Sequence, residues 1–318
     1  MSASYPRRVL LREVGVREGF QFESNVAPTR KKVALLNALA ETGLTQIEAA
    51  SFVSRTRVPG WSDAEAVANA LNTKPDVHFL AFYMNDRGLQ RARAANMLTI
   101  RGNLYATASP DFLYRNTGWT PEIELARATA MAASLAGNGI SVSELTVMAA
   151  FGCNYSGEVT AATVIAKIDQ LLAVCHDQGH GDNQVFCLAD TMAWATPASM
   201  RQVIGAVRER WPTHRIALHL HDTRGLAIAN AMVGLQMGVD CFDAAVAGLG
   251  GCPFAGHKGA AGNMCTEDFA FLCEELGVDT GIDVDQLGAV GRMAEEIVGH
   301  ALPGRVKHGQ SLSSYRNG

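Results

Sequence analysis

The feature that most constrains this chain is a repeated alternation of short β-rich runs with stretches of helical periodicity. Eight runs are predicted to be strands: Val9–Val14, Gln46–Ala49, Val77–Phe82, Leu98–Ala106, Leu145–Met148, Val185–Leu188, Arg215–Leu220 and Cys241–Val246. Helical patterns lie between most of them, and the first begins at Pro28 and ends at Gly43. Alternating strands and helices of this kind build a parallel sheet.

Such a sheet either closes into a barrel or stays open as a doubly wound sheet. The count of eight strands favours the barrel. The turn after the first strand also lacks the G-x-G-x-x-G spacing of a dinucleotide-binding sheet. We therefore predict an α/β fold, a TIM (β/α)8 barrel over residues 1–276. Residues 277–318 hold one more helical pattern, Val284–His300, and are predicted to form a C-terminal helical extension and tail packed on the barrel.

The composition fits a soluble globular protein with a large core and gives no sign of a nucleic-acid surface or a membrane span. The chain has 318 residues, 48% of them hydrophobic, and a net charge of −4. It has no stripe of lysine and arginine and no run near the roughly 18 apolar residues that a transmembrane helix needs. Residues 1–8 lack the apolar core of a secretory signal, so a cytoplasmic location is expected.

The cysteines predict free thiols and not a disulfide framework. There are seven of them, an odd number, and no C-x-x-C pair occurs. A zinc site built from thiolates is not expected without such paired spacing. Six of the seven are interpreted as small core residues, and Cys252 is the exception because it lies between glycines and a proline.

Polar residues gather where the predicted strands end at their carboxyl side, which is the functional rim of a TIM barrel. They are Arg17 and Glu18 after the first strand, Glu48 and Asp190 at the ends of the second and sixth, His219 and His221 on the seventh, and Cys252 and Asn263 after the eighth. We expect these side chains to converge on one rim. The inner positions of the strands are otherwise expected to be apolar.

His219 and His221 form the sharpest pair. Side chains alternate along a strand, so these two imidazoles project from the same face and can bind a metal together. Two histidines that only hydrogen-bond near a strand end are the alternative. With the carboxylate of Glu18, the amide oxygen of Asn263 and no thiolate, the set suits Mg²⁺ or Mn²⁺, while two imidazoles leave Co²⁺ and Zn²⁺ open.

The remaining rim residues each have a chemical and a structural interpretation. The thiol of Cys252 suits proton donation or nucleophilic attack, or it is an incidental small residue in a turn. Arg17 can stabilise a developing enolate oxygen, or it forms a surface salt bridge. Glu48 and Asp190 can orient Arg17 or a histidine, or they form structural ion pairs.

The chain resembles the 3-hydroxy-3-methylglutaryl-CoA lyase family of DRE-TIM metallolyases from about residue 9 to residue 281. The resemblance rests on Leu218–Thr223, on Ala245–Ala255, on Glu48 with Ser51–Ser54, and on Phe151–Tyr155. The metal ligands that it implies are Glu18, His219, His221 and Asn263, with Glu18 where the family has an aspartate. The catalytic residues that it implies are Arg17, Glu48, Asp190, His219 and Cys252.

The resemblance implies a metal-dependent lyase that cleaves 3-hydroxy-3-methylglutaryl-CoA between C2 and C3 to acetyl-CoA and acetoacetate. Arg17 would stabilise the acetyl-CoA enolate, and Cys252 would protonate it. The implied partners are an acyl-CoA substrate and a second copy of the chain in a homodimer. Three alternatives stay open: a lyase for another 3-hydroxyacyl-CoA such as citramalyl-CoA, a Claisen-type acyltransferase, and a non-catalytic CoA-binding barrel.

Overall fold

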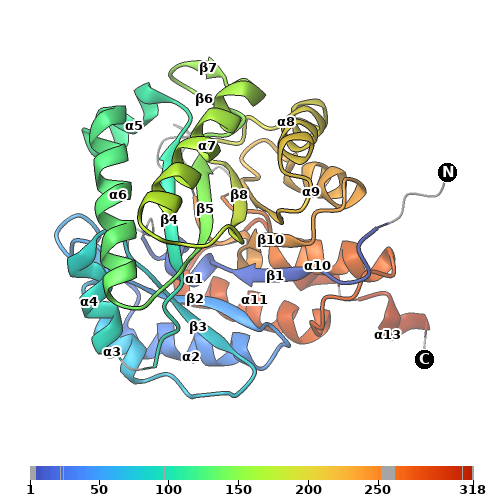
Figure 1. Cartoon of the computed structure of the whole chain (residues 1–318). Helices are drawn as coiled ribbons and strands as arrows, with labels where there is room; N and C mark the ends of the chain where they lie inside the picture. Colours follow the sequence, from blue (N-terminus) through green and yellow to red (C-terminus); the bar gives the residue numbers. More distant parts are fainter. Residues whose placement is uncertain are drawn as a thin grey trace.

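A parallel sheet forms the centre of the computed structural model, which describes residues 5–21, 23, 25–95, 97–251, 262–309 and 311–316. Eight strands lie in the order β3-β2-β1-β10-β9-β8-β5-β4. They are β1 (Leu10–Glu13), β2 (Gln46–Ser51), β3 (His78–Phe82), β4 (Gly102–Thr107), β5 (Val142–Met148), β8 (Val185–Asp190), β9 (Ile216–Leu220) and β10 (Cys241–Ala244). All eight predicted strands are confirmed, and the helices surround them (Figure 1).

The two end strands of this order meet and close the barrel. Thr99 bridges Leu80 in parallel, and its amide donates to the carbonyl of Phe79 at 2.7 Å. This bridge lies outside the named strands, and regular pairing of β4 begins at Gly102, where its ladder with β5 starts, and not at Leu98 as predicted. The predicted (β/α)8 barrel is confirmed.

Most helices lie on the outside of the barrel. They are α1 (Gly15–Gly19), α2 (Thr29–Ala40), α3 (Ala64–Asn69), α4 (Asp86–Ala94), α5 (Pro110–Thr117), α6 (Pro121–Gly137), α7 (Ala161–Asp177), α8 (Pro197–Arg210), α9 (Ala227–Gln236), α10 (Thr266–Glu275), α11 (Val284–Val298), α12 (Val306–Gly309) and α13 (Ser313–Arg316). Two 3-10 turns, η1 (Pro59–Trp61) and η2 (Val246–Gly248), and a small hairpin of β6 (Gly152–Cys153) and β7 (Gly157–Glu158) complete the elements.

Helix α7 shows how local sequence places these helices. The hydroxyl of Thr160 accepts a hydrogen bond from the amide of Thr163 and caps the first turn. Apolar residues then recur every three or four positions, at Val164, Ile168 and Leu171, and all three are buried. The main core therefore lies between such helix faces and the outward-facing residues of the strands.

The C-terminal residues pack against the rest of the chain. Helix α11 confirms the predicted helix, and the ammonium group of Lys307, which follows it, is fully buried and donates to the carbonyl of Leu302 at 2.6 Å. Arg292 of α11 also donates to the carbonyl of Lys307. The boundary at residue 276 stays a prediction. None of the described helices is long and apolar enough to cross a membrane.

Candidate metal centre

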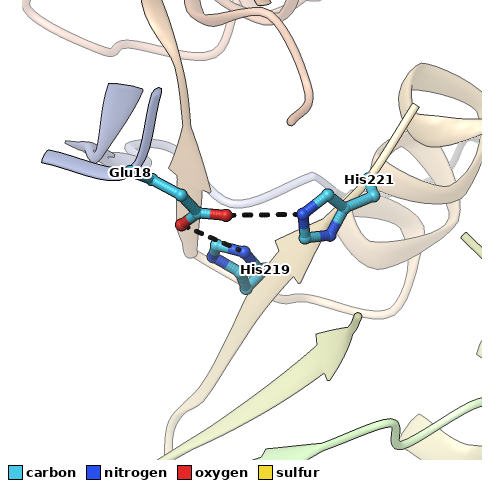
Figure 2. Close-up of side chains that lie close together, drawn as sticks. All are labelled: Glu18, His219 and His221. Carbon is cyan, nitrogen blue, oxygen red and sulfur yellow. Dashed lines mark ion pairs between the residues drawn. The ribbon is translucent and has the colours of Figure 1, made fainter. Parts of the chain in front are cut away.

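Three of the predicted ligands meet at the carboxyl rim of the barrel (Figure 2). One ligand atom each from Glu18, His219 and His221 can be chosen so that all three atoms lie within 4.8 Å of one another. The Nε2 atom of His221 is 3.4 Å from one carboxylate oxygen of Glu18, and that of His219 is 3.8 Å from the other. The predicted convergence of these three side chains is confirmed, and the cluster has the size of a single-ion site.

Two local structures position this cluster. His219 lies on β9 and His221 directly follows it, so strand alternation points both rings inward, with their centroids 5.1 Å apart. Glu18 lies on the short helix α1 after β1, and the indole of Trp61 donates to the carbonyl of Arg17 at 2.7 Å and fixes that helix. The carboxylate therefore reaches the histidines from the neighbouring loop.

The hydrogen bonds behind the histidines set their tautomers. The Nδ1 of His221 donates to the carbonyl of Asp190 at 3.0 Å, and that of His219 donates to Asp243 at 3.1 Å. In its neutral form each imidazole therefore directs its Nε2 lone pair toward the carboxylate of Glu18, as a metal ligand must. Such lone pairs repel one another unless a proton or a cation lies among them, and a divalent metal ion held by both neutral imidazoles and the carboxylate fits this arrangement.

The charges of the cluster are consistent with a cation site. Burial alone would raise the pKa of Glu18, but His219, Arg17 and His221 outweigh it, and the pKa lies well below its usual range. Burial lowers the pKa of His219, but Glu18 and Asp243 outweigh that effect and raise it above its ordinary value. The carboxylate is thus held in its charged form, and a proton on His219 can neutralise it when no metal is bound.

Asn263 supplies a candidate fourth ligand. Its backbone pairs with that of His221, and the residue is 2% exposed. The side-chain oxygen is buried and has no hydrogen-bond partner among the described residues. A buried amide oxygen without a partner costs about 1–3 kcal/mol, and a metal ion next to His221 would satisfy it. The role of Asn263 stays a prediction, but its donor chemistry fits.

Known proteins share this fold and much of this sequence. A model of the HMGL-like family matches residues 8–294. Hydroxymethylglutaryl-CoA lyase (mitochondrial) of Gallus gallus is 38% identical over 290 residues, which are 89% of this chain and 91% of that protein. This chain belongs to the HMGL-like family.

Solved structures of the family agree with the barrel. An HMG-CoA lyase from Acinetobacter baumannii in complex with coenzyme A and 3-methylmalate is 33% identical, with a TM-score of 0.85 and 97% of each chain covered. Hydroxymethylglutaryl-CoA lyase from Pseudomonas aeruginosa is 32% identical, with a TM-score of 0.85 and 95% and 96% of the two chains covered. These likenesses extend over nearly the whole chain.

Arg17 of this HMGL-like chain is fixed beside the cluster. Its Nε donates to Glu48 at 2.6 Å, and its Nη2 lies 3.3 Å from Glu18. The guanidinium carbon lies 4.4 Å from the ring centroid of Phe82, which covers its face. The structure brings Arg17, Glu18 and Glu48 together as predicted, although Glu48 lies inside β2, which runs on to Ser51.

The barrel interior is charged where we expected apolar side chains. Arg12 donates to Asp243 at 2.5 Å and pairs with Glu144, and Arg101 lies 3.6 Å from Glu144 and 3.4 Å from Glu48. Together with the contacts above, these pairs close a loop of alternating charges. We call it the charge ring, and its members are Asp243, Arg12, Glu144, Arg101, Glu48, Arg17, Glu18 and His219.

Four members of the charge ring were not predicted from the sequence: Arg12, Arg101, Glu144 and Asp243. The expectation of apolar inner positions was wrong because these buried charges neutralise one another and need no apolar partner. A signal was present, since Arg12 and Asp243 are charged residues inside otherwise apolar strand patterns. Asp243 supports the metal centre directly, through the Nδ1 of His219.

Asp190 contacts the site through its backbone. Its carbonyl accepts from His221, while one carboxylate oxygen accepts from the amides of Trp194 at 2.7 Å and Ala195 at 3.0 Å. Burial raises the pKa of Asp190 to about 6. In this arrangement the carboxylate of Asp190 holds the turn after β8, and the histidine is oriented by the backbone carbonyl and not by the carboxylate as predicted. A catalytic role for its carboxylate stays a prediction.

Cys252 lies outside the described residues, so its predicted role stays a prediction. The residues that the structure describes on either side of it end at Gly251 and begin again at Gly262. The other cysteines are Cys153, Cys175, Cys187, Cys241, Cys265 and Cys273. All six are buried free thiols, which confirms their interpretation as core residues.

Proposed function

We propose that this protein is a divalent-metal-dependent carbon–carbon lyase that cleaves 3-hydroxy-3-methylglutaryl-CoA to acetyl-CoA and acetoacetate. The observation that carries the proposal is the cluster of Glu18, His219 and His221 with Arg17 fixed beside it, in a member of the HMGL-like family. The relatives compared above are named as lyases for this substrate. A non-catalytic CoA-binding barrel would have no need of this cluster.

The donor set supports Mg²⁺ or Mn²⁺ as the cofactor. Glu18, His219, His221 and Asn263 would hold the ion, and none of them is a thiolate. When bound, a divalent cation polarises the oxygens of the substrate and lowers the pKa of its C3 hydroxyl group. Two imidazoles favour Mn²⁺ more than a site made only of oxygen ligands would.

Arg17 is the proposed electrostatic catalyst. Burial would lower the pKa of Arg17, but Glu48 and Glu18 raise it by more, so the guanidinium keeps its charge. A cation that is fixed before the reaction stabilises negative charge at the thioester oxygen without reorganising. Glu48 and Phe82 hold it in that orientation on two sides.

The proposed reaction moves one proton off the substrate and one proton onto it. A general base takes the C3 hydroxyl proton, and the C3–O electrons then form a ketone as the C2–C3 bond breaks. The bonding pair stays on C2 as the acetyl-CoA enolate, next to Arg17. Cys252 then gives its thiol proton to C2, which yields acetyl-CoA, and acetoacetate leaves as the other product.

Three further predictions accompany this function. The partner is an acyl-CoA, and the Acinetobacter baumannii relative was solved with coenzyme A. A cytoplasmic location is supported by a Danio rerio relative, 37% identical, that is named as cytoplasmic. A homodimer is expected from the resemblance and is tested by sedimentation.

The test is metal-dependent release of acetyl-CoA. The protein is stripped with a chelator, reloaded with Mg²⁺ or Mn²⁺, and given 3-hydroxy-3-methylglutaryl-CoA. We expect turnover that needs the metal and is lost in Cys252→Ala but kept in Cys273→Ala, which removes a buried thiol of α10. Metal binding without acetyl-CoA release would refute this substrate, and citramalyl-CoA and longer 3-hydroxyacyl-CoAs would be screened next.

A further inference from the structure

One buried carboxylate joins three segments of the rim. Glu13, at the end of β1, is 0% exposed. One of its oxygens accepts from the amides of Gly15 at 2.8 Å and Val246 at 3.0 Å, and the other accepts from the hydroxyl of Thr266 at 2.6 Å. Gly15 begins α1, Val246 begins η2, and Thr266 begins α10. Glu13 therefore connects the helix that carries Arg17 and Glu18 with both ends of the segment between η2 and α10.

The approach of α1 to Glu13 leaves no room for a side chain. A Cβ atom at Gly15 would lie 2.6 Å from the carboxylate oxygen of Glu13 and 3.0 Å from the Cβ of Ala245. This contact distance fixes the start of α1 against the end of β10. The position of Arg17 and Glu18 relative to η2 thus depends on the close packing of Gly15 against Glu13 and Ala245.

A second buried carboxylate holds the turn itself. Glu267, also 0% exposed, accepts from the amide of Ala247 at 2.9 Å, and the carbonyl of Ala247 accepts from the amide of Gly304 at 2.9 Å. Ala247 has a φ of +56°, a left-handed conformation that is strained for a residue other than glycine. The amide and the carbonyl of Ala247 are both hydrogen-bonded, so the strained conformation of this turn is fixed.

The described residues on either side of positions 252–261 lie beside the metal centre. After η2 the chain passes Gly250, where a Cβ atom would lie 2.6 Å from the side-chain nitrogen of Asn263. Asn263 in turn pairs with His221 through its backbone. The ends of the segment that contains Cys252 are therefore placed by contacts that begin at Glu13 and Glu267.

We propose that Glu13 and Glu267 are positioning residues that hold both ends of the Cys252 segment, and Asn263 with it, at a fixed place relative to Arg17 and Glu18. This proposal rests on the proposed function. Neither carboxylate touches the metal ligands, so each acts through the backbone that it holds. A misplacement of about 1 Å in such a site can lower a rate on the order of 100-fold.

The test compares Glu13→Gln with a matched control. Glu124→Gln also changes a buried carboxylate that accepts from a backbone amide and a threonine hydroxyl, those of Thr107, but it lies on α6. Two readouts are made on the full chain: kcat and KM for acetyl-CoA release, and the rate at which iodoacetamide alkylates Cys252 with and without coenzyme A, followed by mass spectrometry. The second readout needs no turnover.

We expect Glu13→Gln to lower kcat by on the order of 100-fold with a KM change below about 3-fold, and to change the alkylation rate of Cys252, while Glu124→Gln changes neither. Thr266→Val removes one hydrogen bond and serves if Glu13→Gln does not fold. A folded Glu13→Gln with unchanged kcat and unchanged Cys252 alkylation would overturn the proposal. If the wild type releases no acetyl-CoA but Glu13→Gln still changes the alkylation rate, the proposed function fails and the positioning role stands.

Discussion

Two groups of buried carboxylates lie side by side in this barrel and have opposite electrostatics. In the charge ring, Glu18 and Asp243 lie next to Arg17, Arg12 and His219, and the pKa of each carboxyl is held well below its usual range. Glu13 and Glu267 form no ion pair in the part of the chain that the structure describes, and burial raises the pKa of each to about 7.

The difference shows that burial does not decide the charge of a carboxylate. Desolvation raises the pKa in both groups, and only fixed cations reverse that effect. Glu18 and Asp243 therefore remain ionised and suit a cation, whereas Glu13 and Glu267 change protonation near neutral pH and suit hydrogen bonding to backbone amides. A buried carboxylate thus supplies negative charge in the charge ring, whereas at Glu13 and Glu267 it holds backbone amides in place.

The largest expected effect is on the metal centre. Glu18→Gln removes the charge from the cluster, and we expect loss of Mn²⁺ binding and a fall in kcat/KM of at least about 1,000-fold, since metal chemistry contributes several kcal/mol. Glu18→Asp keeps the charge and is the control. Calorimetry with Mn²⁺ and acetyl-CoA release give the two readouts, and unchanged Mn²⁺ affinity in Glu18→Gln would contradict the site.

The next effect is on stability. Arg12→Met leaves Asp243 and Glu144 without their shared cation, and breaking a buried pair in this way costs about 3–5 kcal/mol of unfolding free energy. Arg210→Met, which removes an exposed pair with Asp169, should cost about 0–1 kcal/mol. Urea denaturation of both variants measures the contrast, and equal losses would mean that the charge ring is not a buried network.

The raised pKa values of Glu13 and Glu267 predict that the free energy of unfolding depends on pH. Because each folded pKa is about 7 and the ordinary value is 4.5, the folded state binds more protons over that range. Stability should fall as the pH rises from about 4.5 to 7, by on the order of 3 kcal/mol per group, and level off above it. Glu267→Gln should flatten that fall, and an unchanged slope would show that Glu267 is ionised in the folded protein.

The smallest effect concerns the support of His219. Asp243→Asn replaces the carboxylate that orients the Nδ1 of His219, and such changes lower metal affinity about 10- to 100-fold. The loss should be smaller than in Glu18→Gln because the ligands themselves remain. Calorimetry measures the Mn²⁺ affinity of both variants. A larger loss of affinity in Asp243→Asn than in Glu18→Gln would show that Glu18 is not the main ligand of the ion.

Sequence patterns were sufficient for the barrel and for the half of the site that lies at the rim. Strand alternation predicted that His219 and His221 share a face, and the position of Glu18 after β1 predicted that it would join them. The far half of the charge ring was not predicted, because Arg12 and Asp243 are 231 residues apart and become neighbours only when β10 pairs with β1. The hydrogen bonds of Glu13 were not predicted for the same reason, since two of its three partners, Val246 and Thr266, come from distant segments.

The most direct test of the central claim, a cation site built by Glu18, His219 and His221, is Co²⁺ substitution followed by visible absorption. We expect one Co²⁺ bound per chain, with weak d–d bands, no thiolate charge-transfer band, and loss of the signal in His221→Ala. A strong thiolate band, or a Co²⁺ spectrum that is unchanged in His221→Ala, would contradict it.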